Sequence, residues 1–131
     1  MRLRAALLAD RKGAGAIEFA VAAPFAIILL VGIAQLGTLF AANAGLQHAV
    51  DEGARYATLY PRPTDSAIIE VINQKKFKLG SSYITGPTLT HGTSNGLPYV
   101  DISMSYAVPL NFVLFTTPPV TLSLTRRTYQ F

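Results

Sequence analysis

One long apolar run dominates the pattern of hydrophobic and polar positions along the chain. No Asp, Glu, Lys or Arg occurs between Glu18 and Asp51, and the run is apolar from Phe19 to about Phe40. About 20 residues at a rise of 1.5 Å cross the ~30 Å hydrocarbon core of a bilayer, so the run predicts a membrane-spanning helix. The helix is expected to continue beyond this run and to end near Tyr60, because the residue before a proline, here Pro61, is driven out of the helical region.

The helix predicted over residues 14–60 is about 70 Å long, so about half of it lies beyond the bilayer. Pro24 removes one backbone donor and predicts a kink in the apolar run. Small residues then recur at every fourth position, and such a ridge lets another helix pack closely, although a helix rich in alanine and glycine also produces such rows through composition alone. The ridge consists of Gly37, Ala41, Gly45, Ala49, Gly53 and Ala57.

Polar residues return at the end of this helix. Asp51 lies four residues before Arg55, and Glu52 lies three residues before it. Both carboxylates can therefore pair with the guanidinium on one helix face. This cluster predicts a solvated helix end outside the bilayer.

Residues 61–131 are predicted to form a small head. Thr64 or Ser66 can cap a second helix that runs to about Phe77 and is ended by Gly80. A core of this size is marginal alone, so the head is expected to pack on the extension of the long helix.

Extended segments are predicted for the rest of the head. A short run over residues 82–91 is broken at Gly86-Pro87, and Asn95-Gly96 is a hairpin signal. Residues 99–106 alternate between apolar and polar side chains, which is typical of a half-buried strand.

A last strand begins at Val120 and is expected to turn Val120, Leu122 and Leu124 inward. The predicted fold class is α+β, with a long N-terminal helix and a small head of one short helix and a roughly three-stranded antiparallel sheet. We accordingly divide the chain into a leader (1–13), a long helix that spans the membrane in its first half (14–60) and an extracytoplasmic head (61–131).

The basic character of the chain is concentrated at its start. The formal net charge is +4, and four basic side chains stand against Asp10 within residues 1–13. Lys and Arg stay on the cytoplasmic side of membrane spans, so the leader predicts a cytoplasmic N-terminus and an extracytoplasmic head. A nucleic-acid partner is not predicted, because it requires a basic face on a folded domain.

Candidate catalytic chemistry is sparse. His48 has helical spacing to Asp51 and Glu52, but three such groups on an exposed helix are typical of a solvated face, so no metal site is predicted. His91 has no carboxylate nearby in the sequence and is expected to face water. Gly13-Ala14-Gly15 lacks the third glycine and the preceding strand of a phosphate loop. We therefore predict no enzymatic activity, no cofactor and no small-molecule substrate.

Glu18 stands at the head of the apolar run, where a carboxylate is costly unless it is paired or interfacial. It can be an interfacial residue whose carboxylate reaches the headgroups. If the chain is cut after Gly13, however, Ala14 becomes the amino terminus and Glu18 becomes the fifth residue. The new ammonium group and this carboxylate could then neutralise each other, within one chain or between neighbouring subunits.

Two other fates of the long helix remain open. Ala42-Asn43-Ala44 has the Ala-x-Ala form of a signal-peptidase site. Cleavage after Ala44 would release a secreted binding domain whose apolar 108–115 loop contacts a ligand or a surface. Without any cleavage, the chain would be a single-pass, membrane-anchored structural protein.

The start of the helix carries a motif. Gly13 follows Arg11-Lys12 and precedes AGAIEF, in which Glu18 is the fifth residue and Phe19 the sixth. This arrangement resembles the processing site of type IV pilin-like proteins. The longer runs GAGAIEFAVAAPFAIILLVGIAQLG and LQHAVDEGARYATLYP resemble the TadE-like family of tight-adherence (type IVb) pilus systems. The resemblance covers residues 11 to about 61 and is loose beyond them.

The resemblance implies a minor pilin or pseudopilin with a part in pilus assembly, adhesion or secretion. A prepilin peptidase would cut between Gly13 and Ala14 at the cytoplasmic face, and Glu18, followed by Phe19, would serve in subunit registration. The implied partners are this peptidase, other pilins, pilus-assembly membrane proteins and the lipid of a bacterial inner membrane. Major pilins of this branch are much shorter, so the head implies a minor component.

Overall fold

The computed structural model describes residues 13–77, 79–112 and 115–130 of the 131-residue chain. Its elements are helices α2 (Ala14–Ala57) and α3 (Asp65–Lys75), the short 3-10 helix η2 (Ser81–Tyr83), and strands β1 (Ile84–Ser94), β2 (Leu97–Val108) and β3 (Val120–Tyr129). The strands form an antiparallel sheet in the order β1-β2-β3. The predicted α+β class, with one long helix, one short helix and three strands, is confirmed.

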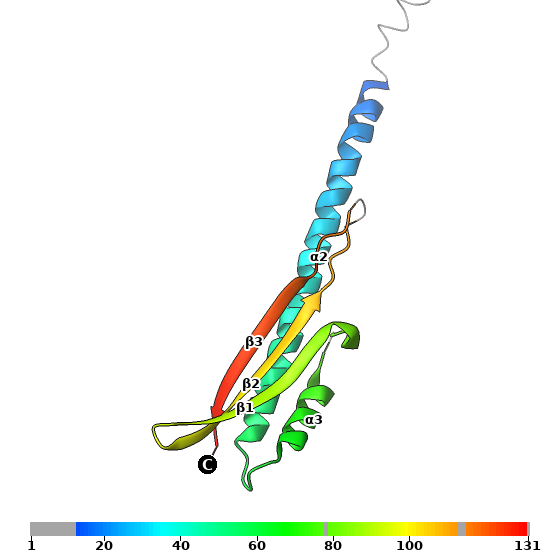
Figure 1. Cartoon of the computed structure of the whole chain (residues 1–131). Coiled ribbons are helices and arrows are strands. Elements are labelled where there is room, and N and C mark those ends of the chain that lie inside the picture. The colour runs from blue at the N-terminus through cyan, green and yellow to red at the C-terminus, as the bar shows by residue number, and fades with distance from the viewer. Residues whose placement is uncertain (1–12, 78, 113–114, 131) are drawn as a thin grey trace, which may run out of the picture.

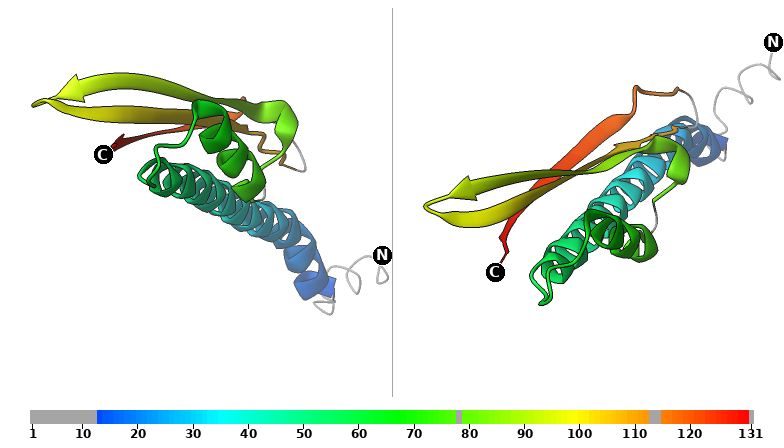
Figure 2. Two further views of the ribbon diagram at one scale, coloured as in Figure 1. Left: turned by 90° about the horizontal axis from the view of Figure 1, so that it is seen from below. Right: turned by 60° about the horizontal axis from the view of Figure 1, so that its bottom comes forward.

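The head packs along only part of α2. Figure 1 shows the sheet and α3 beside the C-terminal half of the helix, while the N-terminal half projects beyond them. In the two views of Figure 2 the sheet forms one layer, and α2 and α3 form the other.

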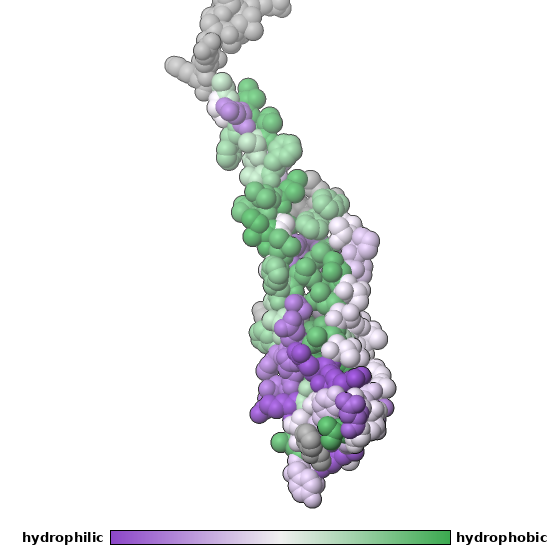
Figure 3. Space-filling view, turned by 90° about the vertical axis from the view of Figure 1, so that its left-hand side faces the viewer, coloured by the Kyte–Doolittle hydropathy of each residue, from purple (hydrophilic) through white to green (hydrophobic). Residues whose placement is uncertain are grey.

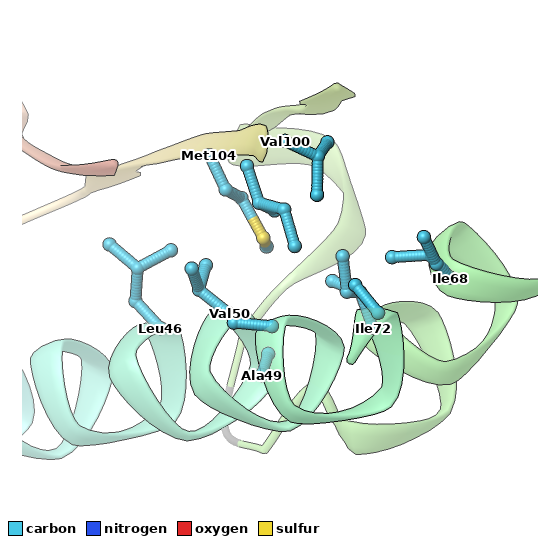
Figure 4. Packing of buried hydrophobic residues seen from close by; sticks show 10 residues of the cluster. Leu46, Ala49, Val50, Ile68, Ile72, Val100 and Met104 are labelled. Atoms are coloured by element: carbon cyan, nitrogen blue, oxygen red, sulfur yellow. The ribbon is translucent and has the colours of Figure 1, made fainter. Parts of the chain in front are cut away.

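The hydrophobic core lies between these two layers, where α2, α3 and the inner face of β2 meet (Figure 4). Strand β2 supplies alternate residues, as its pattern predicts, because successive side chains of a strand point to opposite faces. The most completely buried members of the core are Leu46, Ala49, Val50, Ile68, Ile72, Val100 and Ile102.

The outer strands contribute less to this core. Leu122 and Leu124 of β3 are half-buried and pack against it, as expected. Val120 lies opposite the buried Val108 and therefore on the same inner face as Leu122 and Leu124, as expected, but it remains 38% exposed. It is the first residue of the edge strand β3, whose outer side has no neighbouring strand.

The turns follow their local sequence closely. Asn95 and Gly96 both have positive φ, 52° and 78°, which is the requirement of a tight type I′ hairpin turn. The predicted break at Gly86-Pro87 is instead an irregularity within β1, where the register shifts between Thr85 and Thr88. Proline is tolerated there because β1 is an edge strand. No strand lies on its outer side, so no backbone partner there needs the N–H that proline lacks.

Both helices end earlier than expected. Helix α2 ends at Ala57 rather than Tyr60, and Thr58 and Leu59 continue only as a tightening turn bonded to the carbonyls of the last helical turn. Helix α3 begins as predicted, with the Thr64 hydroxyl accepting a hydrogen bond from the Ala67 N–H at 3.4 Å.

The end of α3 differs from the prediction for a tertiary reason. The helix stops at Lys75, before Phe77, and Gly80 does not terminate it. The chain extends after Lys75 because the backbone at Phe77 passes directly against Gly45 of α2. Gly80 lies beyond this crossing and donates its N–H to the Tyr106 hydroxyl at 3.2 Å.

Gln130 bonds the C-terminal end of the described chain to the corner between α2 and α3 (residues 58–64). Its side chain is 2% exposed, and its N–H donates to the Pro98 carbonyl at 2.9 Å. Its amide nitrogen donates to the Ala57 carbonyl at 3.4 Å, and its amide oxygen accepts a hydrogen bond from Arg62. This buried amide therefore joins the last helical turn, the corner and the sheet.

An ion pair crosses the outer face of the sheet. Asp101 of β2 lies directly opposite Arg127 of β3 and accepts two hydrogen bonds from its guanidinium, at 2.8 and 2.7 Å. The guanidinium also lies over the Tyr99 ring, 3.9 Å from its centroid. The hydrogen bond from Arg127 lowers the pKa of the Asp101 carboxyl below its ordinary value, and the same contact raises the pKa of Arg127.

We expect the head to lose the stabilising contribution of this ion pair in acid. Because the folded-state pKa of Asp101 is lowered, its contribution is fully present above the unfolded-state pKa and is lost as the pH falls through the folded-state pKa. The difference in denaturation midpoint between the wild type and Asp101→Asn should therefore be present at neutral pH and disappear in strong acid. Denaturant titrations followed by circular dichroism over a pH series measure it.

Arg127→Gln is the matched control, because it removes the same ion pair from the other side. It should show the same convergence with the wild type in acid. A constant difference between wild type and Asp101→Asn at every pH would show that the carboxylate charge is not the cause.

Candidate functional site

The N-terminal half of α2 is the most exposed apolar surface of the molecule. Its most apolar 18-residue window has none of its residues buried, and α2 is long and apolar enough to cross a membrane. Figure 3 shows the apolar surface along this half and the polar surface gathered over the opposite end of the molecule. The large exposed apolar side chains of α2 lie in this half and in the turn that follows it, and they are Ile17, Phe19, Val21, Phe25, Ile27, Leu29, Leu30, Ile33, Leu36 and Phe40.

The predicted processing site lies at the start of this helix. Gly13 precedes the first helical residue, Ala14, and both residues are exposed. A Cβ added at Gly13 would meet nothing within 4 Å. No described residue therefore covers the peptide bond between Gly13 and Ala14. Residues 1–12 lie outside the described part of the chain.

Glu18 lies one turn into α2 and is exposed together with Phe19. Among the described residues, Glu18 has neither a hydrogen-bond nor an ion-pair partner. A carboxylate at this place on an otherwise apolar helix is costly in lipid unless it reaches the interface or meets a cation. The helix continues without interruption through Pro24, the predicted kink position, although proline leaves one carbonyl of the preceding turn without its N–H donor.

The ridge of small residues divides between two environments. A Cβ at Gly37 would meet nothing within 4 Å, and Ala41 is half-buried. From Gly45 onward the ridge faces the chain's own head: a Cβ at Gly45 would overlap the Phe77 carbonyl, and one at Gly53 would overlap the Ile72 side chain. Ala49 and Ala57, the other members of this part, are fully buried.

The charge cluster is also divided. Glu52 pairs with Arg55 at 2.8 Å, as predicted, and this hydrogen bond lowers the pKa of the Glu52 carboxyl. Asp51 does not join them, because its carboxylate accepts a 2.7 Å hydrogen bond from Arg126 of β3. The local spacing on the helix is therefore overridden by a contact with the sheet.

A cleft of about 240 Å³ lies between α2 and α3 beside this cluster. Glu52 is the one carboxylate among the described residues that line it, and Arg55 already occupies that carboxylate. The other lining residues are Tyr56, Leu59, Val71 and Lys75.

The two histidines lie apart. His48 is exposed on α2, and within the described ranges no group of three or more His, Cys, Asp or Glu side chains is placed to hold a metal ion. His91 lies in β1 rather than in a loop, and its Nε2 atom is 2.9 Å from the Asp65 carboxylate at the start of α3. His91 is exposed, as expected, and the fold adds a carboxylate partner from a segment 26 residues away in the sequence, which the local pattern could not indicate.

The turn between β2 and β3, residues 109–119, makes a contact that the sequence analysis did not anticipate. Gln35 of α2 donates its side-chain amide to the Asn111 carbonyl at 2.6 Å. The turn is closed by a bridge between Asn111 and Thr116 and by a 3.0 Å hydrogen bond from the Phe112 N–H to the Phe115 carbonyl. The rings of Phe112 and Phe115 are stacked, with centroids 4.8 Å apart. The described part of the apolar 108–115 loop of the sequence analysis thus meets α2 at Gln35, while residues 113–114 lie outside the described part of the chain.

Comparison with known proteins supports the family resemblance that the sequence of the long helix indicates. A family model described as TadE-like protein matches residues 13–55, which run from the residue before α2 almost to its end. The resemblance to the TadE-like family is thereby confirmed, and the matched segment contains Gly13, Glu18 and the exposed half of α2. No curated protein and no solved structure matches the chain.

The two environments of the ridge predict opposite effects of the same substitution. Gly45→Ala should lower the free energy of unfolding by about 1–3 kcal/mol, because the added methyl group overlaps the Phe77 backbone. Gly37→Ala, the matched control, should be neutral or slightly stabilising, since alanine favours a helix by about 1 kcal/mol over glycine. Chemical denaturation of the full chain in detergent micelles, followed by circular dichroism, measures both.

Gly53→Ala should fall between them, because the Ile72 side chain can change its rotamer and a backbone carbonyl cannot. Equal stability of all three variants would contradict the close packing of α2 on the head.

Proposed function

We propose that the chain is a membrane-anchored minor pilin or pseudopilin of a tight-adherence (type IVb) pilus, with a part in pilus assembly, adhesion or secretion. The observation that carries this proposal is the exposed apolar half of α2, which begins with Gly13 and Glu18 and lies within the TadE-like match. This part of the chain is long enough to span a bilayer, and none of the residues in its most apolar window is buried.

The basic leader supports an orientation with the N-terminus in the cytoplasm and the head outside it. The positive charges of residues 1–13 precede the apolar run, and Lys and Arg are retained on the cytoplasmic side. The prepilin peptidase would then meet the Gly13–Ala14 bond at the cytoplasmic face of the bacterial inner membrane.

Cleavage there would bring two opposite charges to one helix end. The new ammonium group at Ala14 and the Glu18 carboxylate would lie four residues apart, about 6 Å along the helix axis. A carboxylate in lipid gains from such a cation, either its own or that of a neighbouring subunit. The latter pairing would set the register between subunits as they enter a filament.

The packing of the head supports anchoring over release after Ala44. Ala42 is 4% exposed and packs with Tyr106 and Val108, and Leu39 contacts the same cluster. A cut after Ala44 would remove both α2 residues from this cluster and leave the sheet side chains uncovered. The fold thus gains from keeping α2 continuous across the predicted signal-peptidase site.

The head also restricts which helix surface can meet other subunits. Gly45, Ala49, Gly53 and Ala57 are covered by the chain's own α3, sheet and connecting segment. Packing against other pilins would therefore use the part of α2 before Ala41, where Gly37 is open and the apolar side chains are exposed.

The N-terminus of the protein in its native membrane tests the proposal. Intact mass and N-terminal sequencing should give a chain that starts at Ala14, and a chain that starts at Met1 when the prepilin peptidase is deleted. Gly13→Val should block the cut, whereas Gly15→Val, the matched control at an equally open glycine, should leave it intact.

A start at Gly45 would indicate a secreted domain. A start at Met1 in the presence of the peptidase would indicate an uncleaved anchor. Either result would overturn the processing step.

Glu18→Ala should leave insertion of the protein in the membrane intact but strongly reduce pilus assembly and adhesion, because it removes the partner of the new amino terminus. Glu70→Ala on α3 is the matched control, since it removes an exposed carboxylate that faces away from the membrane helix. Pilus counts by electron microscopy and surface-attachment assays measure the effect. Unchanged assembly in Glu18→Ala would show that Glu18 is merely interfacial.

A further inference from the structure

The 109–119 turn lies at a defined depth along α2, if the helix crosses the membrane as proposed above. Gln35, which holds the turn, lies seventeen residues after Glu18, about 26 Å along the helix axis. With Glu18 at the cytoplasmic interface, a hydrocarbon core of ~30 Å ends only a few residues beyond Gln35. A tilted helix would place Gln35 deeper still.

Several polar groups at this level are paired within the protein, which lowers the cost of placing them near lipid, although the buried Thr117 hydroxyl of the turn has no hydrogen-bond partner among the described residues. The Gln35 amide donates to the Asn111 carbonyl, and the Thr38 hydroxyl donates to the Gln35 carbonyl at 2.7 Å. The Phe112 N–H is bonded to the Phe115 carbonyl. An unpaired amide or hydroxyl would be costly in this position.

The turn exposes the apolar side chain of Phe115, and Phe112 beside it is half-buried. Phe115 is 52% exposed while its ring stacks on that of Phe112, and Leu110 joins the small cluster that contains Ala42. No Asp, Glu, Lys or Arg occurs between Asp101 and Arg126, just as none occurs between Glu18 and Asp51.

These two uncharged stretches end at the same place in the fold. Asp51 and Arg126, the first charged residues beyond them on α2 and on β3, are joined by a 2.7 Å ion pair. The charge-free part of the head therefore lies beside the charge-free part of the helix, and its turn points toward the membrane-spanning half (Figure 1).

We propose that Phe112 and Phe115 of this turn lie in the outer interface of the same bilayer that α2 crosses. Its partner is a lipid surface, and the head is seated on the membrane rather than held away from it. Phenylalanine is among the apolar side chains that interfacial segments bury at the boundary between the headgroups and the acyl chains. The Gln35–Asn111 hydrogen bond fixes the turn to the helix at this depth.

Single tryptophan probes can test this, because the sequence contains no tryptophan. The full chain carrying Phe115→Trp would be reconstituted at a low protein-to-lipid ratio in phosphatidylcholine vesicles whose lipids are brominated near the glycerol or the methyl end of the acyl chain. We expect a blue-shifted emission maximum and quenching mainly by bromine near the glycerol end. Phe112→Trp should behave in the same way.

Two matched aromatic positions calibrate the measurement. Phe25→Trp, in the exposed apolar half of α2, should be quenched mainly by bromine near the methyl end. Tyr60→Trp, beyond the other end of α2 and 90% exposed, should emit as in water and should not be quenched.

The outcomes separate this inference from the proposed function. Quenching of Phe25→Trp without quenching of the Phe112 and Phe115 variants would overturn the seating of the turn and leave the membrane helix in place. Absence of quenching at Phe25→Trp as well would overturn the membrane placement itself. Shielding of the turn variants that appears only at high protein density, without bromine quenching, would assign the turn to a second copy of the chain and overturn the lipid contact.

Discussion

The packing of the last turns of α2 against β2 and α3 is the contact on which the rest of the structure depends. The head alone has too few apolar residues to form an independent core, and α2 supplies Leu46, Ala49 and Val50 to it. The first half of the same helix has no buried residue in its most apolar window, and the head contacts it at Gln35. One continuous helix therefore serves as both a core element and a membrane-length apolar rod, and the head cannot shift along it without losing its core.

Small side chains make this close packing possible. At Gly45 the neighbour is the backbone at Phe77, and at Gly53 it is a side chain of α3, so the absence of a Cβ has a different consequence at each position. The close approach that the small-residue ridge predicts does occur, but its partner in the C-terminal half belongs to the same chain. A repeat of small residues indicates close packing without indicating whether the partner is internal.

Much of the fold could be predicted because it depends on local signals. The length of the apolar run, the alternation along β2 and the Asn95-Gly96 turn each specify their element within a few residues. The misplaced features depend on contacts between distant segments. Asp51 meets Arg126 rather than Arg55, and His91 meets Asp65, because strand register and helix packing bring them together. The Gln35–Asn111 contact joins residues seventy-six positions apart, and no periodicity reports it.

The arrangement of charge along the molecule has a consequence for how such a subunit could leave the membrane. A subunit that enters a filament must exchange the lipid around the first half of α2 for neighbouring helices, and the surface that makes this exchange is apolar without any Lys or Arg after residue 12 until Arg55. A turn seated in the same lipid would have to make that exchange together with the helix, since the Gln35–Asn111 bond joins them. The stacked phenylalanines would then lie against an adjacent subunit at the level where its helix is also apolar. Lipid contact and subunit contact would thus use one surface in succession, and that surface would bind lipid only while the subunit remains in the membrane.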